Sequence, residues 1–282
     1  MILVTGATGR VGGHAVSALL AAGAETRALA RDPAAARLPD AVEIVPGDLA
    51  KPETLEAALD GVEAVFLVWP TLSADHAAPA AVEAIAARVR RVVYVSARGV
   101  PPGREESDGT ILGSHARLES LIERSGMEWT FLRPGGFAAN TLMWAPQIRE
   151  TGTVRWVHGA ARRPLIHERD IAAVGVRALS APGHGGAAYE LTGPRALTQV
   201  EQVTLIGEAV GRPVRWEEMS PEVAQRAMVA QGMPASLARD ILDGHAAMVT
   251  APETVTTTVE EITGTPATGF GTWARDHADD FR

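Results

Sequence analysis

Three glycines near the start of the chain have the spacing of a phosphate-binding turn. Gly6, Gly9 and Gly12 lie in TGATGRVG at positions 5–12, directly after an apolar run. In this pattern the first glycine permits a tight turn, the second lets backbone approach a pyrophosphate, and the third lets a helix pack close to the strand. Backbone N–H groups at the helix start then face the anion. The segment predicts dinucleotide binding through Gly6, Thr8, Gly9, Arg10, Val11 and Gly12.

Two charged residues after the second predicted strand bear on which dinucleotide binds. Arg31 follows that strand, roughly 20 residues past the glycine turn, where such a unit contacts the adenosine ribose. A guanidinium suits a 2′-phosphate, whereas a ribose without that phosphate requires a carboxylate. We therefore expect NADP(H) to be favoured over NAD(H). Asp32 is the competing candidate, although Asp32 before Pro33 is also typical of a helix N-cap.

Other candidate residues follow the later predicted strands. Asp48 and Leu49 end the third strand, where the carboxylate either accepts a hydrogen bond from the adenine amino group or belongs to a turn. Trp69 and Pro70 end the fourth strand, at the crevice where open α/β sheets bind ligands. Trp69 either walls the nicotinamide or packs in the core. An apolar substrate pocket is expected from Trp69 together with Phe137, Met143 and Trp144.

The elements that must position these residues alternate between strand and helix patterns, which is typical of a parallel sheet with crossover helices. We expect a doubly wound α/β (Rossmann) sheet with a smaller, mostly helical substrate domain. The predicted domains are interleaved, with 1–142 and 167–193 binding dinucleotide and 143–166 and 194–282 binding substrate. Predicted strands span 1–4, 25–30, 42–46, 64–69, 91–96 and 128–133, followed by strands at 189–191 and 214–216, and predicted helices span 10–22, 53–59, 75–88 and 113–125.

Composition argues against several classes of partner and site. The net charge of −8 disfavours nucleic acid and anionic membranes. The most basic cluster, Arg88, Arg90 and Arg91, ends a predicted helix, where cations offset the helix dipole. The chain has no cysteine, and its eight histidines lack metal-ligand spacing, so we expect no metal. Without a signal peptide or an apolar run of about 20 residues, we expect a cytoplasmic protein that acts on a small molecule.

Five segments together resemble one protein family. They are TGATGRVG at 5–12, RALARDP at 27–33, PGDL at 46–49, the stretch 114–140, and YELTGPRALT at 189–198. Over nearly its whole length the chain looks like the NmrA-like atypical branch of the short-chain dehydrogenase/reductase superfamily. The resemblance implies the Rossmann fold and NAD(P)(H) binding. Its bacterial members include reductases of quinones and dyes, and also proteins that only sense the cofactor.

The resemblance also implies roles near the nicotinamide. Ser96 would orient a substrate oxygen, with a hydroxyl bonded to local backbone as the alternative. Asn140 matches a recurring polar position and would cap or orient the substrate loop. The backbone that passes over the nicotinamide would be the segment Pro134, Gly135, Gly136 and Phe137, where two glycines permit close approach, with a plain loop as the alternative.

The catalytic pair of that superfamily is missing. Ile111 stands at the position of the tyrosine in Tyr-x-x-x-Lys, and His115 at the position of the lysine. In the superfamily the tyrosine donates a proton to the carbonyl and the lysine holds the nicotinamide ribose, so an isoleucine argues against simple ketone reduction. His115 would contact the cofactor or act as a general acid, since imidazole titrates near neutral pH. A packing histidine is the alternative.

These observations lead to two functional hypotheses. The first is an NADPH-dependent oxidoreductase that passes hydride to a conjugated acceptor such as a quinone, an enone or a dye. Such acceptors delocalise the incoming charge and tolerate a weak acid. The alternative is a non-catalytic module that senses NAD(P)(H) and acts through a protein partner. A non-redox enzyme on the same fold ranks below both, because no carboxylate pair is placed for such chemistry.

Overall fold

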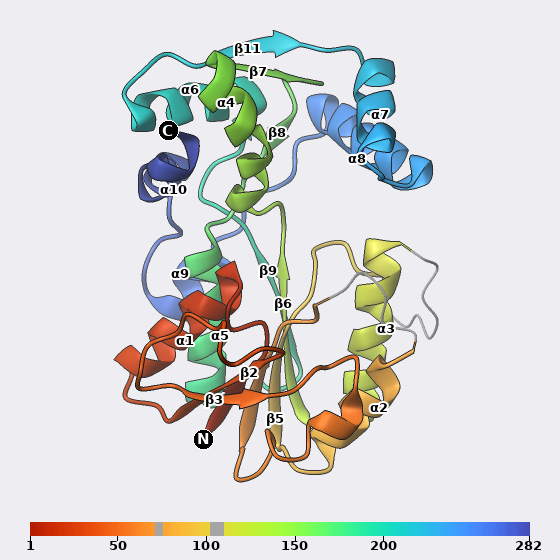
Figure 1. Ribbon diagram of the computed structural model, residues 1–282, viewed down its shortest axis with the longest axis vertical. Coiled ribbons are helices and arrows are strands. Elements are labelled where there is room, and N and C mark those ends of the chain that lie inside the picture. The colour runs from red at the N-terminus through yellow and green to blue at the C-terminus, as the bar shows by residue number, and fades with distance from the viewer. Residues whose placement is uncertain (71–75, 102–109) are drawn as a thin grey trace. The chain divides into compact units, whose positions relative to one another are not determined.

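The computed structural model describes residues 1–70, 76–101 and 110–282, arranged as two compact units (Figure 1). The first unit comprises 1–134, 168–191 and 258–265, and the second comprises 135–167, 192–257 and 266–282. The chain crosses into the second unit after Pro134, earlier than the predicted boundary at residue 142. Residues 258–265 belong to the first unit, although the sequence analysis assigned them to the substrate domain.

A seven-stranded sheet in which every neighbouring pair is parallel forms the centre of the first unit, in the order β3-β2-β1-β4-β5-β6-β9. Its inner strands read as continuous apolar runs because they are covered on both faces. The doubly wound fold is confirmed, and so are the predicted strands. They are β1 (Ile2–Val4), β2 (Thr26–Ala30), β3 (Glu43–Pro46), β4 (Ala64–Leu67), β5 (Arg91–Val95), β6 (Glu128–Pro134) and β9 (Ala187–Leu191).

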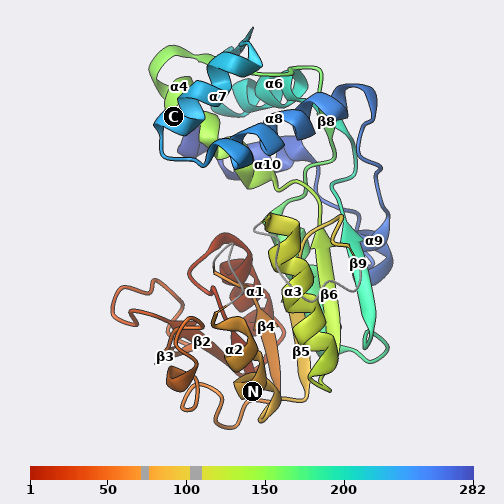
Figure 2. The same cartoon turned by 90° about the vertical axis from the view of Figure 1, so that its right-hand side faces the viewer.

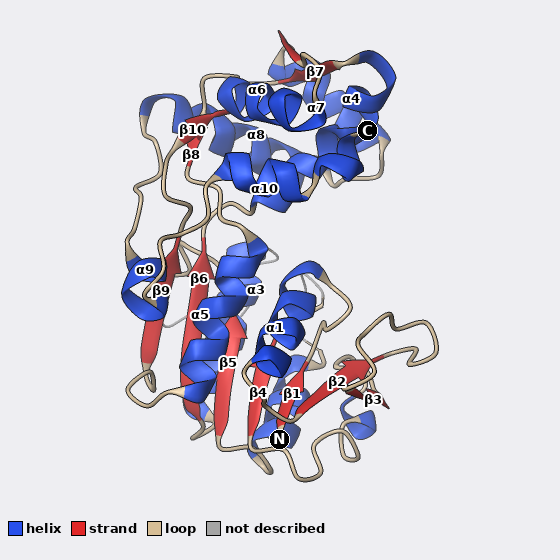
Figure 3. Cartoon of the chain, turned by 90° about the vertical axis from the view of Figure 1, so that its left-hand side faces the viewer, coloured by secondary structure: helices blue, strands red, loops and turns tan. Residues whose placement is uncertain are grey.

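Helices cover both faces of this sheet. Figure 2 shows α2 (Ala78–Ala86) and α3 (Ile111–Arg124) in front of one face. Figure 3, viewed from the opposite side, shows α1 (Arg10–Ala21) and α5 (Glu168–Ser180) in front of the other, and α9 (Thr258–Thr263) packs on α5. The helix predicted at 53–59 is wrong, because the chain forms only the 3-10 turn η1 (Pro52–Thr54) before further turns.

The second unit is mostly helical, as expected, around a core that contains Trp144, Trp156 and Trp273. Its helix α6 (Gln199–Val210) begins at a capping box, in which the Glu201 N–H donates to Thr198 Oγ1 and the Thr198 N–H donates back to the Glu201 carboxylate. The other elements are η2 (Ala138–Trp144), α4 (Ala145–Thr151), β7 (Thr153–Trp156), β8 (Arg162–Arg163), β10 (Leu197–Thr198), β11 (Arg215–Glu218), α7 (Pro221–Ala230), α8 (Ala235–Thr250), α10 (Phe270–Asp276) and η3 (Ala278–Phe281).

The small strands of this unit form two separate pairs. β11, predicted at 214–216, pairs in parallel with β7, and β10 pairs antiparallel with β8. The sequence analysis did not predict β7, β8 or β10. In the described part of the chain, none of the helices has the length and apolar content that a bilayer crossing requires.

Candidate functional site

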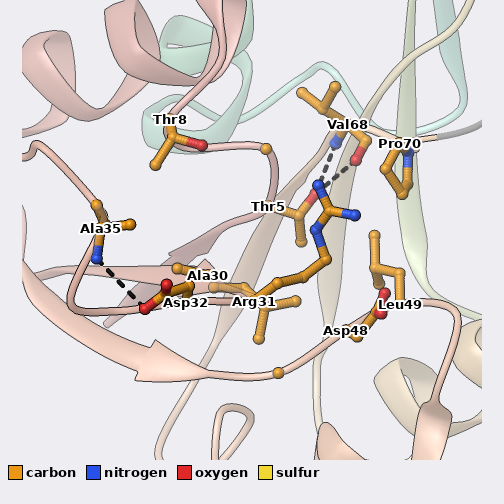
Figure 4. A pocket seen from close by; sticks show the side chains of 14 residues that line it. Thr5, Thr8, Ala30, Arg31, Asp32, Ala35, Asp48, Leu49, Val68 and Pro70 are labelled. Carbon is orange, nitrogen blue, oxygen red and sulfur yellow. Dashed lines mark hydrogen bonds between the residues drawn. The ribbon is translucent and has the colours of Figure 1, made fainter.

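The first unit has a cavity of about 510 Å³ at the carboxyl edge of its sheet (Figure 4). Its walls come from the segments that follow β1, β2, β3 and β4. β1 is the strand at which the chain reverses direction across the sheet, because β2 and β3 lie on one side of it and β4 to β6 on the other. Open α/β sheets bind ligands at this switch point. The volume lies within the range of small-molecule sites.

A side-chain clasp joins the two strands that flank the switch point. Thr5 Oγ1 donates to the Val68 carbonyl at 2.9 Å and accepts from the Val68 N–H at 2.8 Å. The Thr5 N–H donates to the Phe66 carbonyl at 3.0 Å, so the pairing of β1 with β4 continues beyond the last strand residues. Thr5 and Val68 both line the cavity. The clasp therefore fixes the floor of the site.

The glycine turn has the geometry that its spacing predicts. Gly6 has φ +60°, a conformation that residues with a Cβ rarely adopt, and its carbonyl accepts the Gly9 N–H at 2.9 Å. A Cβ on Gly12 would lie 2.2 Å from the Gly6 carbonyl oxygen. Only glycine at position 12 lets α1 start this close to the turn.

The first turn of α1 presents backbone donors that have no acceptor among the described residues. Its N-cap is Gly9, no side chain caps the helix, and the first turn contains no acidic residue. The N–H groups of Arg10, Val11 and Gly12 precede the first intrahelical bond, which the Gly13 N–H makes to the Gly9 carbonyl. With the helix dipole these donors favour an anion. The Val11 side chain is buried and Thr8 and Arg10 are exposed, so Val11 offers backbone alone.

Arg31 lies at the end of β2, is exposed and lines the cavity. Among the described residues no carboxylate pairs with its guanidinium. Asp32 Oδ1 accepts from the N–H groups of Ala34 and Ala35, at 3.1 and 3.3 Å. Figure 4 shows the Arg31 side chain running across the cavity toward Val68 and Pro70, whereas Asp32 turns toward Ala35. The expectation that Asp32 caps a helix is wrong, because residues 33–35 form only a turn.

Asp48 and Leu49 line the opposite wall of the cavity. The Asp48 carboxylate accepts the Ala50 N–H at 3.0 Å through Oδ1, so it has the turn role that the sequence allowed while facing the cavity. Pro70 also lines the cavity. Trp69 does not, and its half-buried ring packs against the core on the α2 and α3 side of the sheet.

His115 lies one turn into α3, with Nδ1 2.7 Å from the hydroxyl of Tyr94 on β5. Burial lowers the pKa of His115 to about 4. The expectation that this imidazole titrates near neutral pH is therefore wrong, and with it the general-acid role that rested on that titration. A neutral imidazole can still donate one hydrogen bond.

Ser96 is 3% exposed and follows β5. Its hydroxyl donates to Glu119 Oε1 at 2.6 Å, and Arg133 donates to both oxygens of the same buried carboxylate, at 2.9 and 2.5 Å. Because the Ser96 proton is committed to Glu119, we do not retain the prediction that Ser96 orients a substrate oxygen. The partner is a carboxylate and not the local backbone that the alternative named.

The remaining predicted residues lie where the chain enters the second unit. Gly136 is buried, and a Cβ there would lie 2.6 Å from Cζ of Arg163, so close packing within this unit requires the glycine. Phe137 is half-buried and bridges to Ile166. The contacts that the sequence predicts from Pro134, Gly135, Gly136 and Phe137 to a nicotinamide stay predictions.

Three other predicted substrate residues lie in η2. Met143 is 53% exposed, and Asn140 is exposed with no side-chain hydrogen bond to the described residues, so it caps nothing there. Trp144 is 2% exposed and packs edge-on against Trp216 in the core of this unit. We therefore correct the prediction for Trp144, because its ring has almost no surface left to line a pocket.

Sequence reasoning missed Thr5, Ala35, Ala36 and Tyr94. The two alanines line the cavity in the loop after β2 and carry no chemical signal in the sequence. Tyr94 did have one. Tyr94 and Ser96 are two residues apart on a strand, and their partners His115 and Glu119 are four apart on a helix, so each pair shares one face of its element.

Residues 6–182 match a protein family described as NAD(P)H-binding. The chain is 39% identical to a (4-alkanoyl-5-oxo-2,5-dihydrofuran-3-yl)methyl phosphate reductase of Streptomyces griseus, over all of this chain and 99% of that one. It is 40% identical to an NAD(P)H azoreductase of Xenophilus azovorans, with the same coverage. A crystal structure of an NADPH-dependent quinone oxidoreductase from Escherichia coli superposes with a TM-score of 0.77 at 25% identity, over 98% of this chain and 99% of that one.

Proposed function

The chain belongs to the NAD(P)H-binding family and is an NADP(H)-dependent reductase of the NmrA-like atypical type, and from this premise we propose that its acceptor is a conjugated small molecule such as a quinone, an enone or an azo or cationic dye. One observation carries the proposal. The position of the usual proton donor holds Ile111, and the nearby His115 is kept neutral by burial, which lowers its pKa to about 4. A conjugated acceptor delocalises the incoming charge and takes its proton from water.

The residues around the cavity fit the adenosine and pyrophosphate parts of NADPH. We assign the pyrophosphate to the N–H groups at the start of α1, for which the described part of the chain offers no acceptor. We assign the 2′-phosphate to Arg31, and the adenine to the wall formed by Asp48 and Leu49. When bound, NADPH supplies a hydride to the acceptor. The protein's part is to hold the cofactor at the switch point, through donors that Gly6 and Gly12 leave accessible.

The names of the relatives support the choice of acceptor. A quinone and an oxo-dihydrofuran with an alkanoyl group contain a C=C bond in conjugation with carbonyl groups, and an azo compound contains an electrophilic N=N bond. The three proteins reported above are named as reductases or as an oxidoreductase, and this supports reduction over the sensing alternative. The cytoplasm as compartment and the lack of a nucleic-acid partner stay predictions from the sequence.

A panel of acceptors tests the proposal by the oxidation of NADPH, followed by its absorbance. The panel contains a quinone, an azo dye, an enone and a saturated ketone of similar size to the enone. We expect turnover of conjugated acceptors and a rate for the saturated ketone lower by about 100-fold or more, since a placed general acid contributes on that order. Equal rates for enone and saturated ketone would refute the proposal.

A further inference from the structure

Tyr94 is a buried tyrosine in the first unit to which neither the sequence nor the proposed function gives a role. It is the fourth residue of β5 and is 0% exposed. Its hydroxyl lies 2.7 Å from Nδ1 of His115, and the two ring centroids are 5.9 Å apart. Within the described residues this is the only hydrogen bond of either side chain.

The burial of Tyr94 decides which group donates in this pair. A buried hydroxyl proton needs an acceptor, and among the described residues the lone pair of His115 Nδ1 is the acceptor within reach. Burial raises the pKa of Tyr94 well above its usual value, and the charge of Glu119 raises it further, so the phenol keeps its proton. The hydroxyl therefore donates to Nδ1, and the single proton of the neutral imidazole lies on Nε2.

We propose that Tyr94 is a positioning residue that fixes His115 in the tautomer protonated at Nε2, so that His115 presents one neutral N–H donor outward. The value of this donor for reduction rests on the proposed function. His115 Nε2 makes no hydrogen bond within the described chain, and it is not among the polar atoms that the fold buries without a partner. The donor is thus free to serve a ligand oxygen.

The position of Tyr94 in β5 places the Nε2–H group of His115 near the carboxyl edge of the sheet, to which we assign the cofactor. Tyr94 lies opposite Leu67 of β4 in the strand register, and the residue after Leu67, Val68, lines the cavity. One turn along α3 from His115, Glu119 bonds to Ser96 and Arg133. The imidazole is therefore attached to the sheet directly through Tyr94 and indirectly through its own helix, which limits rotation of the ring.

This arrangement gives His115 a chemical role that differs from general acid catalysis. An Nε2–H group stabilises a ribose hydroxyl, or negative charge that develops on an acceptor oxygen, without giving up its proton. Full transfer would leave an imidazolate or draw the proton of Tyr94 into the ring, and burial beside Glu119 opposes a tyrosinate. No bond to hydrogen is broken at His115 in this scheme.

Nitrogen NMR on protein labelled with ¹⁵N-histidine tests the proposal directly. In the wild type we expect long-range ¹H–¹⁵N spectra near neutral pH to show an unprotonated Nδ1 and a protonated Nε2 for His115. In Tyr94→Phe the two nitrogen shifts should move toward each other, because both tautomers become accessible. A proton on Nδ1 in the wild type, or unchanged shifts in the variant, would overturn the proposal.

The chain contains a matched control. His184 Nδ1 lies 2.8 Å from the hydroxyl of Tyr189, a pair of the same atoms outside the cavity. Tyr189→Phe should change the shifts of His184 and leave those of His115 and the turnover number unchanged. Thermal unfolding of both variants checks that each is folded.

Kinetics separate this proposal from the proposed function. Tyr94→Phe should lower kcat roughly fivefold with little change in KM for NADPH, as expected for a weakened hydrogen bond. His115→Ala should lower kcat at least as much. If the tautomer is as proposed but His115→Ala retains full kcat, the catalytic part of the proposal is overturned, while reduction of conjugated acceptors stands on its own test.

Discussion

A cavity with arginine in its lining lies at each of two edges of the central sheet, the carboxyl edge and the amino edge. The two edges differ in the carboxylate partners that these guanidinium groups have. At the carboxyl edge, Arg31 faces a cavity of about 510 Å³ without a carboxylate partner among the described residues. At the amino edge, a cavity of about 420 Å³ is lined by Arg88, Arg90 and Arg91. Arg88 pairs with Glu56 at 2.8 Å, and Arg91 pairs with both oxygens of Glu128 at 3.1 Å.

The difference shows that a cluster of cations does not by itself make an anion site. Arg91 also donates to the Leu179 carbonyl, so its guanidinium ties the start of β5 to the end of α5. The sequence assigned this cluster to the end of a helix, and the structure gives two of its members structural partners. Arg31 instead lines a cavity together with Gly6 and Thr8 of the glycine turn, which leads into the first turn of α1. The dipole of that helix favours an anion at its start.

The largest effect is expected from Gly12→Ala, which changes the glycine turn at the carboxyl edge. The new Cβ would lie 2.2 Å from the Gly6 carbonyl oxygen, so the turn must move. We expect loss of measurable NADPH binding and a lower free energy of unfolding, by about 1–3 kcal/mol as for other overpacked sites. Fluorescence titration with NADPH and denaturant unfolding measure the two quantities.

Gly13→Ala is the control, because its Cβ would meet nothing closer than 3.4 Å. This variant should bind NADPH as the wild type does. Normal binding by Gly12→Ala would show that the close approach of α1 is not what forms the site.

The next effect is expected from Arg31→Ala, which removes a cation that lines the carboxyl-edge cavity and has no carboxylate partner among the described residues. KM for NADPH should rise about 10- to 100-fold, since a charge-assisted contact to phosphate is lost, while KM for NADH stays nearly constant. Steady-state kinetics with each cofactor measure this. Arg90→Ala is the matched control, because Arg90 is exposed and lines the amino-edge cavity without a partner among the described residues. An equal rise in both variants would mean that net charge, and not position, governs affinity.

A smaller effect is expected at the amino edge from Glu128→Gln, which leaves Arg91 with a weaker partner. Both side chains are partly exposed, so solvent screens the pair, and we expect about 1 kcal/mol less stability against urea. The kinetic constants for NADPH should not change. A change in KM for NADPH in this variant would show that the amino edge also affects cofactor binding, and it would contradict the distinction between the two edges.

The smallest effect concerns pH. His115 has a folded pKa of about 4, below the ordinary value of 6.5, so kcat should show no inflection from this residue between about pH 5 and 8. The sign for stability follows from the same shift. The unfolded chain binds the proton first, so the folded state loses stability as the pH falls from 6.5 toward 4. An inflection near pH 6.5 that disappears in His115→Gln would contradict this assignment.

The sequence was sufficient for the sheet and for the geometry of the glycine turn. The alternation of strand patterns with apolar-periodic helices that close in glycine or charged turns predicted the strands, and the glycine spacing predicted the turn at Gly6 and Gly12. These features are local, because a few neighbouring residues determine them. The NADP(H)-dependent reductase follows from the same motifs together with the family resemblance.

The parts of the candidate site that the sequence did not predict depend on contacts between distant segments. The periodicity of the sequence contains no information on such contacts. Ser96 was predicted to face substrate, yet Glu119 takes its proton across 23 positions of the chain. The pKa of His115 depends on how deeply α3 packs against β5. Trp144 was expected in a pocket, and its place in a core was decided by Trp216 on a strand far along the chain. The helix predicted at 53–59 was wrong although its apolar pattern is local, because the chain forms a 3-10 turn and further turns there.

The Thr5 clasp has a consequence for how an enzyme opens its sheet to a ligand. In a regular β-ladder each peptide group forms hydrogen bonds to a neighbouring strand. Backbone groups that are paired in this way cannot bind a ligand. Here a hydroxyl stands in for a peptide unit, because it both accepts from and donates to Val68. The polar groups of Val68 are satisfied while the backbone from Gly6 onward leaves the ladder. One side-chain oxygen thus replaces the backbone pairing that would otherwise continue past Thr5.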